Sequence, residues 1–438
     1  MVIEVAETFV KKAAKKADNG NTVVNKTVNI VEVANDVEVV IPPLKKEKDI
    51  MKIVKEDEKI TKAVKRGGGG NVKETMKNTT QIEKSIIIDV TQLMKPFYTL
   101  LEIALRPYNG DKVCVTGASG FLASWLIKRL LLSGYHVIGT VRDLGKKKKV
   151  EHLWKLEGAT ERLKLVQADL MEENSFDNAI MGCKGVFHIA SPVLNHISDD
   201  PKSEILEPAV QGTLNVLRSC RKNPTLVRVV LASSSSAVRV RDGFDSNIPL
   251  DESSWSSLEL CEKLKAWYPM SKIMAEKAAW EYCKENGIDL VTILPSFIIG
   301  PSLPQDLCST ASDVLGLFKG ETEKFQWHGR MGYVHIDDVA LCHILLYENK
   351  ASHGRYLCSS TIMENDELVS MLATRYPGFP IPKRFKKLDR PHYELNTGKI
   401  ESLGFKFKSV EEMFDDCVAS FVEEGHLTLP HNTRHIAI

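Results

Sequence analysis

An α/β fold with a doubly wound parallel sheet is predicted by the pattern of this sequence from residue 112 onward. Six short runs rich in β-branched residues alternate there with longer helical stretches, which is typical of a parallel sheet covered on both faces. The first run also leads into a glycine-spaced turn that opens a helix. The expected strands are 113–116, 136–141, 163–168, 186–189, 227–232 and 290–294.

Composition limits the kind of partner that the chain binds. The 58 basic and 57 acidic residues give a formal charge of +1, so no global field draws the protein onto nucleic acid or an anionic membrane. No apolar stretch approaches the ~18 residues of a membrane span. Nine single cysteines without a C-x-x-C pair predict reduced thiols in a cytoplasmic compartment and no bound metal. A small-molecule partner is expected.

The first 110 residues differ in composition from the rest. They hold 19 basic and 15 acidic residues, against 39 and 42 in the remainder, and they include a run of four glycines at 67–70. We expect a low-complexity, mostly disordered extension with a few short helices, for example at 9–16. It is either an electrostatic tether or a dispensable segment, and either a genuine extension or an artefact of gene delimitation. Glu4 and Glu7 argue against a secretory signal.

The turn after the first strand has the spacing of a dinucleotide-binding loop. Gly117 permits a tight turn, Gly120 lets the backbone approach a pyrophosphate, and the small Ala123 stands where helix and strand pack closely. Free N–H groups near Phe121 and Leu122 then face the anion. A turn of this kind is by itself also found as a simple structural loop, and its position between strand and helix favours the nucleotide.

Residues at the ends of the next strands predict the form of the cofactor. Arg142 follows the second strand, where an NAD-selective fold usually offers an acid, and it is suited to a 2′-phosphate, so NADP(H) is expected. An exposed basic turn is the alternative. Asp169 follows the third strand, beside the expected adenine or as a helix cap. Ala190, Ser191 and Pro192 follow the fourth.

The residues that carry chemistry follow the fifth strand. A serine run, 233–236, ends that strand, and Tyr268 and Lys272 come later, four apart and hence on one helix face. Carbonyl reduction needs a proton donor and a hydrogen-bond donor for the developing alkoxide, roles that fit Tyr268 and Ser234. Lys272 would stabilise the phenolate and hold the nicotinamide ribose. An ordinary exposed helix face is the alternative for this pair.

Two further residues near this site are open to interpretation. Asn215, on the helix after the fourth strand, either orders a proton-relay water or serves packing. Pro269 directly follows Tyr268, and we expect it to be tolerated as the first residue of its helix.

From 111 to about 428 the chain resembles the plant dihydroflavonol 4-reductase and cinnamoyl-CoA reductase group, which are extended short-chain dehydrogenases/reductases with a Rossmann fold. The matching stretches are VTGASGFLASWLIKRLL, GTVRD, QADLMEENSFDNAI, GVFHIASPV, the serine run, the Tyr268/Lys272 pair, LPSFIIGPSLP and YVHIDDVA. The resemblance implies an NADP-binding Rossmann domain at 111–300. It also implies a smaller substrate-binding lobe at 301–438, with some return to the main sheet.

The resemblance also implies a set of site residues. The catalytic residues would be Ser234, Tyr268 and Lys272. The cofactor contacts would be Thr116, Gly117, Ala118, Ser119, Gly120, Phe121, Leu122, Arg142, Lys148 or Lys149, Asp169, Leu170, Ala190, Ser191, Pro192, Tyr268, Lys272, Pro295, Ser296, Phe297 and Ile298.

Within this group, LCSTASDVLGLFKGETEKFQWHG and KFKSVEEMFDDC are most similar to the tetraketide α-pyrone reductases of sporopollenin precursor synthesis for pollen walls. A polyketide-derived or phenylpropanoid-like substrate is implied, with dihydroflavonol or cinnamoyl-CoA reduction as alternatives. The stretch 266–272 lacks the asparagine and cysteine of the cinnamoyl-CoA reductase signature. A catalytically inert NADP-sensing protein is an alternative of another class. Association with pathway enzymes or with the endoplasmic reticulum surface stays open.

Deletion of residues 1–105 is predicted to leave folding and turnover nearly unchanged, because every expected strand and site residue lies after them. Solubility and NADPH oxidation of the truncated and full-length proteins check this. A truncated protein that is soluble but inactive would show that the extension is functional.

Overall fold

The computed structural model describes residues 110–192, 200–243, 245–386, 388 and 391–428. The predicted disordered extension at 1–110 and its short helix at 9–16 therefore lie, apart from residue 110, outside the described residues. Within the described part of the chain, no helix is both long enough and apolar enough to cross a lipid bilayer.

The main sheet has seven strands, all parallel, in the order β3-β2-β1-β4-β5-β6-β9. The strands are β1 (Lys112–Val115), β2 (His136–Val141), β3 (Leu163–Gln167), β4 (Gly185–His188), β5 (Arg228–Ala232), β6 (Leu290–Pro295) and β9 (Gly354–Cys358). The order reverses between β1 and β4, as in a doubly wound fold. The predicted fold class is confirmed, and the six expected strands match the first six of this sheet. The sequence did not predict β9.

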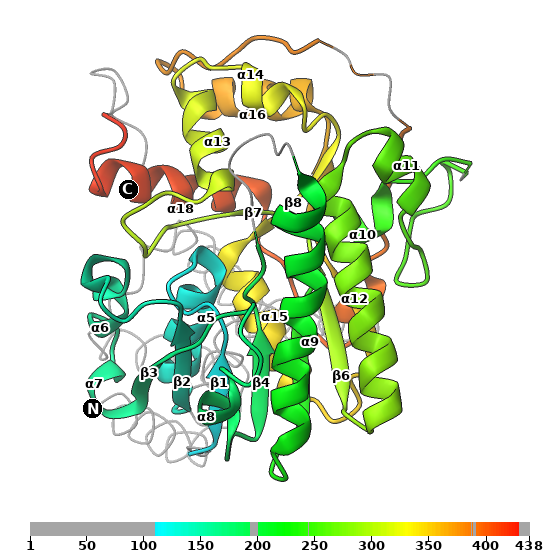
Figure 1. Ribbon diagram of the computed structural model, residues 1–438. Helices are drawn as coiled ribbons and strands as arrows, with labels where there is room; N and C mark the ends of the chain where they lie inside the picture. The colour runs from blue at the N-terminus through cyan, green and yellow to red at the C-terminus, as the bar shows by residue number, and fades with distance from the viewer. Residues whose placement is uncertain (1–109, 193–199, 244, 387, 389–390, 429–438) are drawn as a thin grey trace, which may run out of the picture. The chain divides into compact units, whose positions relative to one another are not determined.

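Helices cover both faces of this sheet because its strands alternate between two apolar cores. Val113 and Val115 contribute to the core under α5 (Phe121–Leu132) and α15 (Ile336–Glu348). Cys114, between them, contributes to the core under α9 (Glu207–Lys222) and α12 (Trp267–Asn286). Figure 1 shows α9 and α12 side by side.

Shorter elements connect these layers. They are η1 (Lys147–Lys149), α6 (Glu151–Trp154), α7 (Ala159–Arg162), α8 (Asp177–Ile180), the π-helical η2 (Lys202–Leu206), α10 (Ser236–Arg239), α11 (Leu258–Lys263) and α17 (Gly398–Glu401). One ionic contact fastens the two helices on the first face. Asp337 of α15 accepts a hydrogen bond from Trp125 Nε1 at 2.8 Å and pairs with Arg129, and both partners lie in α5.

A smaller lobe is built around a second, three-stranded sheet of order β10-β8-β7. Its elements are β7 (Phe297–Ile299), β8 (Met331–His335), β10 (Thr361–Met363), α13 (Ser309–Phe318), α14 (Glu323–Gln326), α16 (Asn365–Arg375) and α18 (Val410–Glu423). An aromatic-rich core that includes Phe318, Tyr333 and Phe414 holds the lobe together. The predicted domain boundary at residue 300 stays a prediction. After that residue, β9 is the segment of the chain that joins the main sheet.

Candidate active site

The turn between β1 and α5 brings backbone unusually close to the neighbouring strand end. Gly117 has a φ of +71°, and a Cβ there would lie 3.1 Å from Ala190 Cβ. The Gly120 N–H donates to the Gly117 carbonyl at 2.9 Å, which closes the turn. Only glycine fits position 117 without strain, because the backbone is left-handed and the space is already filled. Glycine at position 117 therefore lets the turn pack directly against the residues that follow β4.

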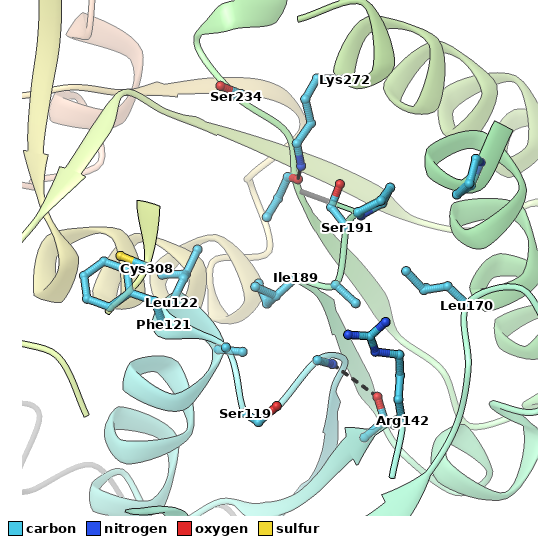
Figure 2. Close-up of a pocket in the computed structure, with 18 of the residues that line it drawn as sticks. Ser119, Phe121, Leu122, Arg142, Leu170, Ile189, Ser191, Ser234, Lys272 and Cys308 are labelled. Atoms are coloured by element: carbon cyan, nitrogen blue, oxygen red, sulfur yellow. Dashed lines mark hydrogen bonds between the residues drawn. The ribbon is translucent and has the colours of Figure 1, made fainter. Parts of the chain in front are cut away.

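A cavity of about 760 Å³ opens above this turn, at the carboxyl ends of the main-sheet strands. In Figure 2 Ser119 and Arg142 lie toward one end of the cavity, and Ser234 and Lys272 toward the other. The cavity brings together most of the site residues predicted from the sequence. Those that line it are Gly117, Ser119, Gly120, Phe121, Leu122, Arg142, Asp169, Leu170, Ala190, Ser191, Pro192, Ser234, Tyr268, Lys272, Pro295, Ser296 and Ile298.

Five predicted cofactor residues are not part of this lining. Thr116 and Ala118 are fully buried beneath the turn, and Phe297 packs in the core of the lobe. Lys149 is exposed, and Lys148 lines a different cavity, of about 700 Å³, together with Trp125 and His152. A role of these five in cofactor contact stays a prediction. For Thr116 the structure shows a supporting position instead.

Thr116 and His188 form a closed hydrogen-bond chain under the cavity. Thr213 Oγ1 donates to the Ala209 carbonyl at 2.8 Å, so it accepts from His188 Nε2, 3.3 Å away. His188 Nδ1 then accepts from Thr116 Oγ1 at 2.9 Å. The Thr116 oxygen in turn accepts the N–H groups of residues 189 and 190, each at 3.0 Å. This chain fixes a neutral imidazole and ties the end of β1 to the end of β4.

The charge state of His188 follows from its position. The ring is 1% exposed. Burial, reinforced by the charge of Lys272, lowers the pKa of His188 to about 3. The histidine is therefore neutral under the site at every pH near neutrality.

Ser234, Tyr268 and Lys272 approach the cavity from two elements. Ser234 follows β5 and is 9% exposed, whereas Tyr268 is 38% exposed at the start of α12. Lys272 is buried, and its Nζ donates to the Ala232 carbonyl at 3.1 Å and lies 5.8 Å from the centre of the Tyr268 ring. The arrangement places a hydroxyl, a phenol and an ammonium at one end of the cavity.

Pro269 is the third residue of α12, not the first as expected, because the helix already begins at Trp267. Its missing N–H falls within the first turn, where no helical acceptor exists. The Met270 N–H donates to the Ala266 carbonyl at 3.2 Å, so the helix continues past the proline.

The structure assigns other polar groups near the site to supporting contacts. Ser233 donates to Glu276 Oε2 at 2.6 Å, so its hydroxyl is engaged next to Ser234. Asn215 donates to the Leu170 carbonyl at 2.8 Å, and its oxygen accepts from Gln211 and Arg218. These bonds favour the packing role for Asn215. The Asp169 Oδ1 accepts the Met171 N–H at 2.8 Å while the residue also lines the cavity.

Sequence reasoning missed part of the cavity wall. Glu204 and Pro208 reach it from η2 and α9, and residues 308–310 reach it from the start of α13. No motif marks Glu204 or Pro208, whereas residues 308–310 lie inside the stretch LCSTASDVLGLFKGETEKFQWHG, which supported the resemblance but was not assigned to the site. Thr140 had a signal, because it directly precedes the end of the second predicted strand; its Oγ1 accepts the Gly117 N–H at 3.2 Å.

These features define a dinucleotide-dependent enzyme of the extended short-chain dehydrogenase/reductase class. Residues 113–358, more than half of the chain, match the NAD dependent epimerase/dehydratase family, and the chain belongs to this family. The resemblance inferred from the sequence motifs is thereby confirmed.

Comparison with individual proteins shows which members of the family this chain is similar to. Over 317 residues the chain is 71% identical to tetraketide alpha-pyrone reductase 1 of Arabidopsis thaliana, a match that covers 72% of this chain and 97% of the relative. It is 43% identical over 324 residues to cinnamoyl-CoA reductase CAD2 of Medicago truncatula, covering 73% and 98%. The crystal structure of yeast methylglyoxal/isovaleraldehyde reductase Gre2 complexed with NADPH superposes with a TM-score of 0.63 at 28% identity, covering 72% of this chain and 100% of that one.

His188 is predicted to make the free energy of unfolding depend on pH. Its folded pKa of about 3 lies below the unfolded value of about 6.5, so only the unfolded chain gains this proton as the pH falls below 6.5. The contribution of the neutral His188 to the free energy of unfolding is fully present above pH 6.5. It is lost by up to about 1.4 kcal/mol per pH unit as the pH falls toward 3.

Urea unfolding at several pH values between about 7.5 and 5 measures this slope. The variant His188→Gln should show a shallower slope by nearly one proton. The exposed His353 offers a matched control, His353→Gln, whose slope should equal that of the parent. An unchanged slope in His188→Gln would contradict the neutral buried histidine.

Proposed function

We propose that this enzyme reduces a carbonyl group of a polyketide-derived substrate, of the tetraketide α-pyrone type, to an alcohol in sporopollenin precursor synthesis. The chain is an NADP-dependent oxidoreductase. The observation that carries the reaction type is the single cavity that joins the glycine turn to Ser234, Tyr268 and Lys272. The substrate class is supported by 71% identity to the α-pyrone reductase, against 43% to the cinnamoyl-CoA reductase.

The residues of the cavity fit the cofactor. Gly117 and Gly120 line the cavity with bare backbone just before α5 begins, and Arg142 offers an exposed guanidinium to a 2′-phosphate beside the end of β2. The Lys272 ammonium would hold the nicotinamide ribose. When bound, NADPH supplies a hydride to the substrate carbonyl.

The chain's own groups complete the chemistry. Ser234 Oγ donates a hydrogen bond to the carbonyl oxygen and stabilises the charge that develops on it. The Tyr268 hydroxyl transfers its proton to that oxygen, which yields the alcohol. The Lys272 ammonium stabilises the phenolate that Tyr268 becomes, while the Ala232 carbonyl keeps the ammonium at the cavity wall.

The setting of the enzyme belongs to the same proposal. All nine cysteines are free, and eight of them are buried, which suits the reducing cytoplasm. We propose that the enzyme acts in the cytoplasm. We further propose that it contacts other enzymes of its pathway or the surface of the endoplasmic reticulum. A catalytically inert sensor is disfavoured, because the proton donor and its lysine share one cavity.

Arg142 is predicted to set the preference for NADPH over NADH. Because a charge-assisted contact to a phosphate is worth about 1.5–3 kcal/mol, Arg142→Asp should lower kcat/KM with NADPH by roughly 10- to 100-fold and change NADH little. Steady-state kinetics with both cofactors measure the ratio. Lys155→Ala, which removes an exposed cation paired with Glu151, should alter the ratio much less. Equal efficiency of the parent with both cofactors would overturn the assignment.

Substitutions of the three catalytic candidates are predicted to differ in kind. Tyr268→Phe should bind NADPH normally but nearly stop reduction, because the proton donor is gone. Lys272→Ala should weaken both cofactor binding and reduction. Ser234→Ala should slow reduction by about 10²- to 10³-fold, and the engaged hydroxyl of Ser233 is poorly placed to replace it.

Fluorescence titration of NADPH and single-turnover NADPH oxidation separate these effects. The substrates are an alkyl pyrone ketone, a dihydroflavonol and a hydroxycinnamoyl-CoA. Preference for the pyrone supports the proposed substrate class, and preference for either other compound replaces it. Substantial single-turnover reduction by Tyr268→Phe would mean that another group is the acid.

A further inference from the structure

The catalytic face of α12 continues past Lys272 to a third ionisable residue. Tyr268, Lys272 and Glu276 are spaced by four, so they lie along one face of the helix. The first two line the cavity, but Glu276 does not, and it is only 1% exposed. Burial of a carboxylate is unfavourable unless the group is paired with a cation and hydrogen-bonded.

Three adjacent strands of the main sheet converge on the Glu276 carboxylate. From the residue that directly follows β5, the Ser233 hydroxyl donates to Oε2 at 2.6 Å. From β6, Thr292 Oγ1 donates to Oε1 at 2.9 Å. From β9, Arg355 Nε donates to the same Oε1 at 2.8 Å. Thr292 and Arg355 are direct neighbours in the pairing of β6 with β9.

Arg355 extends this contact to the segment that leads into α11 and α12. Its guanidinium lies 3.7 Å from the centre of the Trp255 ring. Its Nη1 donates to the carbonyls of Glu252 and Ser254 at 2.7 and 2.6 Å. The pair with Glu276 is almost fully buried, since the arginine side chain is 8% exposed. Both charges are thus compensated by each other and by further hydrogen bonds.

The segment before Ser234 is consequently held to α12 at two successive residues. The Ala232 carbonyl accepts from Lys272 Nζ, and the Ser233 hydroxyl donates to Glu276. Both contacts come from the same helix face, one turn apart. Ser234 is the next residue, and its position relative to Lys272 therefore depends on both contacts.

We propose that Glu276, paired with Arg355, is a positioning residue that sets the distance between Ser234 and Lys272 by holding Ser233 to α12. This inference rests on the proposed function, because it assigns Ser234 and Lys272 to the reaction. Glu276 does not itself touch the reacting atoms. Its effect reaches them through the backbone of residues 232–234.

The test is Glu276→Gln in the full chain, which keeps the size of the side chain but removes its charge. Single-turnover NADPH oxidation with the alkyl pyrone ketone should fall by roughly 10- to 100-fold, as expected for a misplaced reacting group. NADPH affinity by fluorescence titration should fall less than in Lys272→Ala, because the ammonium and the glycine turn are both retained. Ser233→Ala should reproduce part of the loss, and the double variant should lose less than the product of the two factors.

Asp289→Asn is the matched control for stability. It breaks another ion pair of the main sheet, at 2.9 Å between Arg228 and Asp289, at the start of β5 and away from the site. It should lower the thermal midpoint and leave turnover unchanged. If Glu276→Gln behaves in the same way, with a lower midpoint and parental turnover, the pair is only structural and the inference is wrong.

Crystal structures of the parent and of Glu276→Gln give a readout that needs no substrate. The hydrogen bond between Lys272 and the Ala232 carbonyl should be lost or lengthened in the variant, and an unchanged bond overturns the inference. A parent that reduces none of the three substrates would refute the proposed function while this comparison still decides the role of Glu276. If Glu276→Gln does not fold, Ser233→Ala supplies both measurements.

Discussion

The common direction of all seven strands in the main sheet is the constraint on which the site depends. Because every strand is parallel, residues that follow different strands emerge at one edge. Between β1 and β4 the strand order reverses, and the connections leave on opposite faces, so the edge opens there. The cavity occupies this opening. Gly117, Arg142 and Ser234 meet in it although more than a hundred residues separate the first from the last.

Two polar networks lie beneath the cavity, one under the nucleotide turn and one under the serine segment. Under the nucleotide turn, His188 is held neutral in a chain of hydroxyl and backbone donors. Under the serine segment, Glu276 has a compensating arginine. The neutral His188 adds no charge beneath the part of the cavity that binds phosphates. The paired charges of Glu276 and Arg355 join α12 to the strands. The two networks use different means to the same end, which is a rigid wall.

Much of this architecture could be predicted because the signals are local. Alternating β-branched runs indicated six strands, and the glycine spacing located the turn. The pair Tyr268/Lys272 was recognisable from its spacing together with the upstream serine run and the glycine turn. Strand β9 escaped because its five residues, with a glycine and an arginine at the start, are too short and too polar for the pattern. Glu276 escaped for a different reason, since a glutamate in a helix is ordinarily solvent-exposed and only its three distant partners show otherwise. Lys148, which the resemblance assigned to the cofactor, lines the second cavity in this structure, and its role in cofactor contact stays a prediction.

The late position of Arg355 in the chain has a consequence for biosynthesis. Ser233, Glu276 and Thr292 are all translated before it, and the strand that carries it follows a large part of the smaller lobe. During synthesis on the ribosome, Arg355 is therefore added some eighty residues after Glu276, the carboxylate that it neutralises. Burying a carboxylate without its counter-charge is unfavourable, so we expect α12 to pack less stably against the nascent sheet until β9 has been made. The edge strand β9 is the last strand of the main sheet to be synthesised. The ion pair that supports the catalytic end of the protein therefore forms only after the nucleotide-binding region has been made.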